Sequence, residues 1–457
     1  MTNNPYDIKD NLSLQINKYA DRCITNSCID PDLYDKYNVK RGLREKGGTG
    51  VLTGLTEIGD VHSFDVVDGV SVPCKGQLFY RGIDIKEIVH GFIAENRFGF
   101  EEVTYLLLFG ELPNKKRLEN FNNVLAEYRT LPTSFVRDII MKATSSDMMN
   151  QLARCVLSLY SWDDNPDDTS IPNVVRQSLS LIARIPLISV YSYHAMRHYH
   201  HGEDLHIINP DPQLSTAENI LRLLRPNSSY TDLEAKILDL ALVLHAEHGG
   251  GNNSTFTTHV VSSSGTDTYS AIAASLGSLK GPRHGGANIK VKHMFDNMKE
   301  TVDDWNDDDE IKSYLKGILD KRLYDKSGLI YGIGHAVYAI SDPRAELLKD
   351  FTKKLAVAKG RTDELKLYEN VERIAPEVIS KSHKRKKSVS ANVDFYSGFI
   401  YSMLGLPDEL YTPMFAAARM AGWSAHRIEE IINAGKIIRP AYKNVAKKEN
   451  YIPLNKR

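Results

Sequence analysis

The spacing of apolar residues predicts helices along most of the chain. FEEVTYLLLFGELP carries one apolar face and ends at Gly110 and Pro113. Further blocks with helical spacing are DMMNQLARCVLSLYS, NVVRQSLSLIARIPLISVYSYHAMRHY and STAENILRLLRP. From Ile85 onward the pattern is helical almost without interruption. The acidic stretch Asp163–Asp168 lacks the spacing of a calcium-binding loop, which favours a connection between helices.

A different pattern precedes these helices. Apolar and polar residues alternate in VLTGLTEIGDVHSF and GVSVPCKGQLFY, which predicts short strands and hairpins. The stretch Gly47–Gly50 in front of them lacks the Lys-Ser/Thr ending of a phosphate-binding loop, so a turn is expected. Residues 1–40 are polar and expected to be partly helical. We therefore predict a mainly α protein with a few short N-terminal strands.

The distribution of charge indicates two domains. Residues 286–395 are more charged than the rest, with DDWNDDDEIK and KSHKRKK, yet they keep the helical period. We interpret residues 1–285 as the first part of a large helical domain and residues 286–395 as a smaller helical domain. Residues 396–457 return to the large domain and end in a C-terminal arm.

Composition narrows the classes of function. The 457 residues include 57 basic and 58 acidic ones, so neither nucleic acid nor a membrane surface is an expected partner. The four cysteines form no CxxC pair, which argues against a zinc site built from them. No apolar run reaches transmembrane length, and the N-terminus lacks a secretory signal. We expect a cytoplasmic protein with no metal.

Several histidines stand next to glycines. LEAKILDLALVLHAEHGGGN places His245 and His248 on one face if its helix continues that far, with Gly249–Gly251 ending the helix. His284 lies in GPRHGG and His335 in GIGH. Each motif alone is weak, because a single histidine is more often a polar residue at a helix end.

Together and in this order, the motifs resemble the citrate synthase family. They are HAEHGGGN, GPRHGGAN, GIGHAVY followed by DPRA, NVDFYSG and a late arginine-containing helix, with RGLREKGGTGVLTGLT and LFYRGIDI upstream. The match runs from about residue 40 to about residue 440. It implies an almost all-helical homodimer whose small domain closes over an active site between the domains.

The resemblance also implies roles for individual residues. Asp394 is the base that deprotonates acetyl-CoA, His284 donates to the thioester oxygen and His335 polarises the oxaloacetate carbonyl. The oxaloacetate carboxylates bind His248, Arg344, Arg419 and Arg439, the last supplied across the dimer interface. Acetyl-CoA, a co-substrate and not a covalently bound cofactor, lies along Leu329, Ile330, Tyr331, Gly332, Ile333 and Gly334.

Two departures from the family leave alternatives open. Ala336 and Ala339 stand where many bacterial members have basic residues, and DMMNQLARCVLSLYSWDDNPDD replaces an HPM-type motif common in the family. The run Lys384–Lys387 is either a contact for the CoA phosphates or a solvated face. A 2-methylcitrate synthase using propionyl-CoA would keep the same residues, because one methylene is worth only about 1–3 kcal/mol. A non-catalytic family member and a metal enzyme built on the histidines are the remaining alternatives.

Overall fold

The structure is a computed structural model that describes residues 5–45, 49–68, 70–334, 337–338, 340–383, 389–433 and 435–457. Contacts between Cα atoms divide the chain into two compact units. One unit comprises Met1–Gly54 with Arg439–Arg457, and the other comprises Leu55–Ile438. The further division of the longer unit at residues 285 and 395 stays a prediction.

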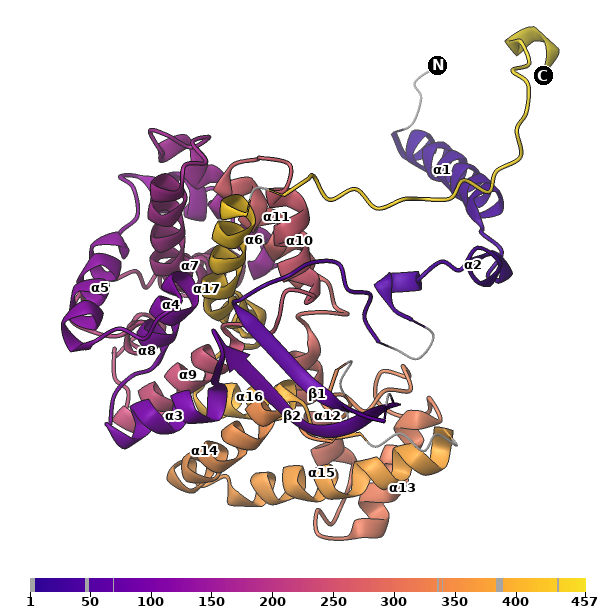
Figure 1. Cartoon of the computed structure of the whole chain (residues 1–457). Helices are drawn as coiled ribbons and strands as arrows, with labels where there is room; N and C mark the ends of the chain where they lie inside the picture. The colour runs from indigo at the N-terminus through magenta and orange to yellow at the C-terminus, as the bar shows by residue number, and fades with distance from the viewer. Residues whose placement is uncertain are drawn as a thin grey trace. The chain divides into compact units, whose positions relative to one another are not determined.

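Helices make up most of the described chain, which confirms the expected mainly α fold (Figure 1). The first part contains α1 (Pro5–Ser27), α2 (Asp32–Lys36), α3 (Ile85–Ala94), α4 (Phe100–Phe109), α5 (Lys115–Tyr128), α6 (Met148–Leu159), α7 (Ile171–His201), α8 (Thr216–Leu224) and α9 (Asp232–His245). The second part contains α10 (Asn253–Ser262), α11 (Thr268–Lys280), α12 (Ala287–Thr301), α13 (Asp308–Leu319), α14 (Pro343–Lys359), α15 (Thr362–His383), α16 (Val393–Met403) and α17 (Tyr411–Ile432). Short 3-10 turns are η1 (Arg41–Leu43), η3 (Tyr160–Trp162), η4 (Asp408–Leu410) and η5 (Leu454–Lys456), and η2 (Val136–Met141) is a π-helical turn.

The expected strands form a small antiparallel sheet. Strand β1 (Gly59–Val67) pairs with β2 (Val70–Tyr80), and the short β3 (Ile83–Asp84) pairs with the end of β2. The register of β1 and β2 shifts between His62 and Phe64. The alternating sequence pattern therefore predicted this hairpin correctly.

Two buried helices lie at the centre of the longer unit. Helix α9 starts in a capping box formed by Thr231 and Glu234, each of which bonds the backbone N–H of the other. Helix α17 packs against α4, α7, α9 and α10, and Trp423 near its middle is fully buried. Because both helices are surrounded by others, polar side chains on them must face one another or a ligand.

The helices from α12 to α16 pack mainly among themselves. Helix α16 contacts α12 and α14, and α15 contacts α13 and α14. The rings of Phe295 and Tyr368 stack with centroids 3.5 Å apart, and Phe399 stacks on the other side of the pair at 4.5 Å from Tyr368. This packing fixes α16, whose N-terminus carries Asp394.

The smaller unit is held by different contacts. The Arg41 guanidinium lies 4.9 Å from the centre of the Tyr34 ring, and Lys443 lies 5.4 Å from that of Tyr37. Among the described residues, no helix is long and apolar enough to cross a membrane.

Candidate active site

Asp394 lies in the first turn of α16, and two neighbouring side chains fix this turn. Asn392 caps the helix by accepting a hydrogen bond from the Asp394 N–H at 3.0 Å. Asp342, which precedes α14, accepts from the Val393 N–H at 3.2 Å. Burial raises the pKa of Asp394 to about 6, although the charge of Arg344 opposes the rise. A carboxylate of this kind is a suitable proton acceptor near neutral pH.

Arg344 lies next to this turn in a rigid position. Its side chain is buried, and its Nε and Nη2 donate to the two oxygens of Asp342 at 3.0 and 2.8 Å. Its guanidinium is 5.9 Å from the Tyr338 ring, which in turn lies 5.5 Å from the ring of His248. Arg344 and His248, both predicted oxaloacetate ligands, therefore flank the same tyrosine.

Arg419 lies at the centre of α17 and is fully buried. Its Nε donates to the His245 carbonyl at 2.6 Å. Nη1 and Nη2 are also buried, and no residue in the described part of the chain accepts from them. Burial lowers the pKa of this arginine to about 10, so it keeps its charge at neutral pH. It is therefore a buried cation whose two terminal nitrogens make no hydrogen bond within the described part of the chain.

A second buried arginine on the same helix shows what a structural arginine looks like here. Arg427, eight residues later, donates to Thr268 Oγ1 at 3.1 Å, Ser262 Oγ at 3.0 Å and the Thr266 carbonyl at 2.8 Å. All its nitrogens therefore have protein acceptors. The contrast favours Arg419 as a ligand-binding residue, since unpaired buried donors are costly.

The structure corrects the expectation for the two histidines at the end of α9. The helix ends at His245, so His248 lies beyond it and the two do not share a helix face. The helix also ends before Gly249, so the glycine run does not end it. Beyond His245 the backbone leaves the helix, and the Glu247 N–H donates to the Tyr80 hydroxyl at 3.3 Å.

His245 is a candidate site residue that the sequence analysis did not assign. Both ring nitrogens are buried, and neither has a hydrogen-bond partner within the described residues. Burial, then the charges of Arg344 and Arg419, hold the pKa of His245 well below its usual range. The same two arginines that face Asp394 thus face a neutral imidazole. In the sequence, the position of His245 in the HAEH motif was the signal that could have identified it as a site residue.

His284 lies in the loop between α11 and α12. The loop packs tightly, because a Cβ on Gly285 would lie 2.2 Å from the Leu279 carbonyl oxygen. His284 Nε2 is 3.0 Å from Ser254 Oγ. Burial, with a contribution from Arg419, lowers the pKa of His284 to about 4. The imidazole is therefore neutral at physiological pH and is suited to hydrogen bonding.

The predicted CoA segment runs beside the start of α16. Asn392 donates its backbone N–H to the Gly332 carbonyl at 2.9 Å, and Gly334 donates to the Ser390 carbonyl at 2.8 Å. Gly332 has φ +80°, and a Cβ there would lie 2.8 Å from the Phe395 ring. The segment is mixed in exposure, with Leu329 exposed and Ile330 buried. Gly332 lets the backbone pass close to Phe395, the residue that follows Asp394.

Three sets of residues from the sequence analysis cannot be added to the site around Asp394 and Arg419. His335, with Ala336 and Ala339, lies outside the described residues, as does Lys384–Lys387. Arg439 is exposed and belongs to the smaller unit, which is described by itself. The remaining predicted residues lie in the longer unit.

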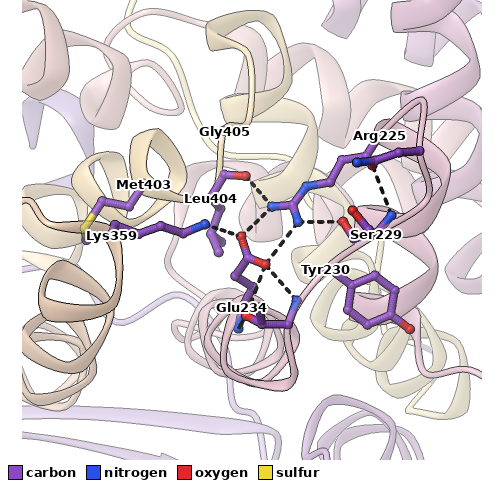
Figure 2. A pocket seen from close by; sticks show the side chains of 10 residues that line it. Arg225, Ser229, Tyr230, Glu234, Lys359, Met403, Leu404 and Gly405 are labelled. Carbon is purple, nitrogen blue, oxygen red and sulfur yellow. Dashed lines mark hydrogen bonds and ion pairs between the residues drawn. The ribbon is translucent and has the colours of Figure 1, made fainter.

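A surface hollow of about 510 Å³ lies between the start of α9 and the ends of α14 and α16 (Figure 2). Glu234 accepts there from Arg225 at 2.8 Å and from Lys359 at 2.6 Å. Arg225 also donates to the Leu404 carbonyl at 2.7 Å. All three charged side chains are engaged in these contacts, so the hollow is better explained as a packing junction than as a substrate site.

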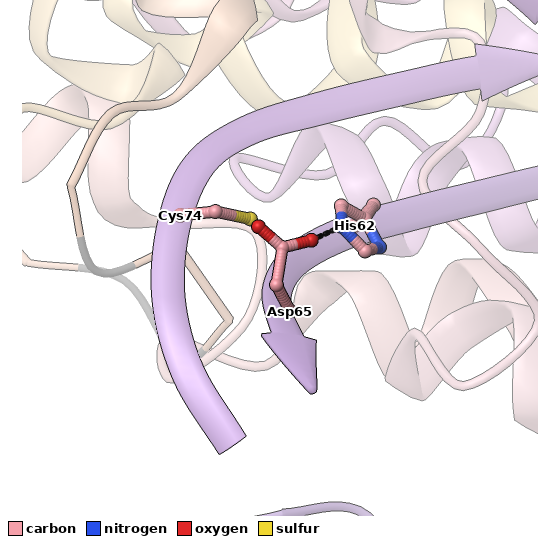
Figure 3. A group of neighbouring side chains, drawn as sticks. All are labelled: His62, Asp65 and Cys74. Atoms are coloured by element: carbon pink, nitrogen blue, oxygen red, sulfur yellow. Dashed lines mark hydrogen bonds and ion pairs between the residues drawn. The ribbon is translucent and has the colours of Figure 1, made fainter. Parts of the chain in front are cut away.

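Three side chains of the types that can bind a metal ion lie together on the hairpin (Figure 3). His62 Nε2 lies 2.9 Å from Asp65 Oδ1, and Cys74 lies beside the same carboxylate. Burial and then the charge of Asp65 raise the pKa of the Cys74 thiol. A protonated thiol is a poor metal ligand, and His62 already partners Asp65, so this group makes a weak metal site.

Comparisons with known proteins give consistent matches. The family model described as the C-terminal domain of citrate synthase matches residues 47–441. The citrate synthase of Synechocystis sp. is 33% identical over 396 residues, covering 86% of this chain and 90% of that protein. The 2-methylcitrate synthase 1 of Corynebacterium glutamicum is 31% identical over 418 residues, covering 90% and 98%.

One similar solved structure contains ligands. It is the ternary complex of carboxymethyl coenzyme A and oxaloacetate with citrate synthase from Thermoplasma acidophilum. It superposes with a TM-score of 0.71 at 25% identity and covers 92% of this chain and 99% of that one. The similarity thus extends over nearly the whole chain.

Proposed function

This chain belongs to the citrate synthase family, and we propose that it joins acetyl-CoA to oxaloacetate and hydrolyses the product to citrate and CoA. The observation that carries the proposal is that the two buried terminal nitrogens of Arg419 have no acceptor among the residues that the structure describes. A planar guanidinium suits a carboxylate of oxaloacetate. Arg344 and the neutral His245 and His284 lie within electrostatic reach of Arg419.

The reaction begins with removal of a proton from the methyl group of acetyl-CoA. Asp394, with its pKa raised to about 6, accepts that proton. A thioester methyl is a weak acid, so the transfer requires stabilisation of the enol oxygen as charge develops there. Neutral His284 donates that hydrogen bond. The new carbon–carbon bond then forms between the methyl carbon and the keto carbon of oxaloacetate.

The remaining roles follow from the family resemblance. His335 polarises the keto group and protonates the new alkoxide, and water then cleaves the thioester of citryl-CoA. Arg344, Arg419 and His248 bind the dicarboxylate, together with Arg439 of the partner subunit in a homodimer. The pantetheine and adenine of acetyl-CoA lie along Leu329–Gly334. No covalently bound cofactor takes part.

A second candidate is synthesis of 2-methylcitrate from propionyl-CoA. It is favoured by the similarity to the 2-methylcitrate synthase of Corynebacterium glutamicum, which covers as much of this chain as the citrate synthase matches do. Both reactions use the same base and the same oxaloacetate ligands. The difference lies in room for one methylene, which is worth about 1–3 kcal/mol.

The test is release of CoA thiol by the purified chain given oxaloacetate with acetyl-CoA, and separately with propionyl-CoA. Higher kcat/KM with acetyl-CoA supports citrate synthesis, and higher kcat/KM with propionyl-CoA supports the second candidate. No release with either would contradict both. Arg419→Gln is expected to abolish the stabilisation of the protein by oxaloacetate, whereas Arg427→Lys lowers stability but retains that response.

A further inference from the structure

A cluster of two histidines and three glutamates lies at the C-terminal end of α17, outside the proposed active site. His426 and Glu429 belong to α17 with Glu430, His259 belongs to α10, and Glu247 follows α9. The side chains of Glu247 and His426 are fully buried, and the other three are 12–18% exposed. The five residues come from three parts of the chain, so their meeting is a feature of the fold.

The two imidazoles face each other through one nitrogen each. His259 Nε2 lies 3.1 Å from His426 Nδ1. The opposite nitrogens face carboxylates: His259 Nδ1 is 2.7 Å from Glu430 Oε2, and His426 Nε2 is 3.1 Å from Glu247 Oε1. A carboxylate only accepts hydrogen bonds, so His259 Nδ1 carries a proton and His259 Nε2 presents a lone pair to His426. His426 Nε2 makes no hydrogen bond with any described residue, although Glu247 lies close to it. When His426 carries its proton on this outer nitrogen, beside Glu247, the two inner nitrogens present lone pairs to each other.

Two lone pairs at this distance repel unless a cation lies between them. The surroundings reinforce the need for positive charge. Glu429 Oε2 lies 3.8 Å from His426 Nδ1 and is buried without a hydrogen-bond partner among the described residues. The other oxygen of Glu429 accepts from the Glu57 N–H at 2.8 Å, which orients the carboxylate. Three carboxylates thus surround two imidazoles.

We propose that His259 Nε2, His426 Nδ1 and Glu429 bind a divalent transition-metal ion of the zinc type. Their ligand atoms all lie within 4.8 Å of one another. Zinc–nitrogen bonds of about 2.0–2.1 Å place tetrahedral ligands about 3.3 Å apart, close to the 3.1 and 3.8 Å found here. Glu430 accepts a hydrogen bond from the outer nitrogen of His259, as carboxylates commonly do for metal-bound histidines, and Glu247 lies 3.1 Å from the outer nitrogen of His426.

The position of this metal site suggests a structural role. A Cβ on Gly250 would lie 3.6 Å from His426 Cε1 and 3.7 Å from His259 Nε2. The metal would therefore join α10 and α17 beneath the glycine loop that follows His248. It takes no part in the condensation and adds a metal where none was expected from the sequence.

The test uses the full-length protein freed of metal with a chelator. Zn²⁺ affinity is measured against a chromophoric competitor, thermal stability is measured with and without Zn²⁺, and Co²⁺ absorption reports tetrahedral coordination. We expect one tight site per chain and a higher Tm with Zn²⁺. His259→Gln and Glu429→Gln should each weaken binding at least about 100-fold, and Glu430→Gln about 10- to 100-fold.

Matched controls separate this site from surface histidines. His62→Ala removes the hairpin group and His200→Ala removes a histidine at the end of α7, and both variants should bind Zn²⁺ like the parent. The proposal is overturned if the parent binds no Zn²⁺ tightly, which would mean that only a proton lies between the two imidazoles. It is also overturned if Glu429→Gln binds Zn²⁺ as tightly as the parent. If His259→Gln does not fold, Glu429→Gln decides, because that residue is partly exposed.

Discussion

Ser254 Oγ lies 3.0 Å from His284 Nε2, so the direction in which the serine hydroxyl donates sets the tautomer of the histidine. The serine oxygen accepts from Trp423 Nε1 at 3.1 Å, since an indole N–H can only donate. The single hydroxyl proton then has two acceptors, His284 Nε2 and Asn252 Oδ1, the latter at 3.0 Å. Donation to His284 leaves the imidazole proton on Nδ1, available for the thioester oxygen.

Ser254→Ala is therefore expected to lower kcat while oxaloacetate affinity stays unchanged. Loss of the hydrogen bond costs about 1–3 kcal/mol, which corresponds to roughly a 5- to 150-fold lower rate. Steady-state thiol release and oxaloacetate titration measure the two quantities. Ser275→Ala is the matched control, because that buried serine bonds Thr258 at 2.7 Å instead of His284. An unchanged kcat in Ser254→Ala would refute the role.

The raised pKa of Asp394 predicts the acid limb of the pH profile. A base must be ionised to accept a proton, and the pKa of about 6 means that the ionised fraction falls below that pH. The value of kcat/KM should therefore drop about tenfold per pH unit on the acid side. Asp394→Asn should lower the rate about 100-fold or more and lose this limb. A profile that stays flat down to pH 5 in the parent would contradict the assignment.

Gly422 permits the close approach of α17 to the chain that carries Glu247. A Cβ there would lie 2.4 Å from the Ala246 carbonyl oxygen and 2.5 Å from Glu247 Oε2. Gly422→Ala should lower the free energy of unfolding by about 1–3 kcal/mol through overpacking. Gly91→Ala in α3 is the control, because its Cβ would meet nothing within 4 Å. It should stabilise by about 0.5–1 kcal/mol, and equal effects in urea unfolding would disprove the steric account.

The sequence predicted the helices and the hairpin because local patterns record them, and its motifs named candidate site residues whose roles stay predictions. Periodicity describes one element at a time, so it could not show that Asp342 joins Arg344 to the start of α16. The distinction between Arg419 and Arg427 was also hidden, since only the fold shows which arginine has acceptors. His259 and His426 lie far apart in the chain, so no spacing revealed their pairing.

Glu234 illustrates how a buried charge pair makes stability depend on pH. Burial raises the pKa of Glu234, but hydrogen bonds from Arg225 and Lys359 outweigh that effect and lower it to about 2. Because this lies below the value of 4.5 for an unperturbed glutamate, the ionised form stabilises the folded state. The stabilisation is complete above about pH 4.5 and is lost as the pH falls toward 2.

Glu234→Gln should therefore lower the Tm at pH 7 and reduce its fall between pH 5 and pH 3. The variant leaves Arg225 and Lys359 beside a neutral amide, and breaking a buried pair costs about 3–5 kcal/mol at most. Glu377→Gln is the control, because Glu377 pairs with Lys381 at an exposed position and such pairs contribute little. Thermal unfolding at several pH values measures both variants. If the Tm of Glu234→Gln and the Tm of the parent fall in parallel on acidification, the Glu234 carboxylate of Figure 2 is not the group that makes stability depend on pH.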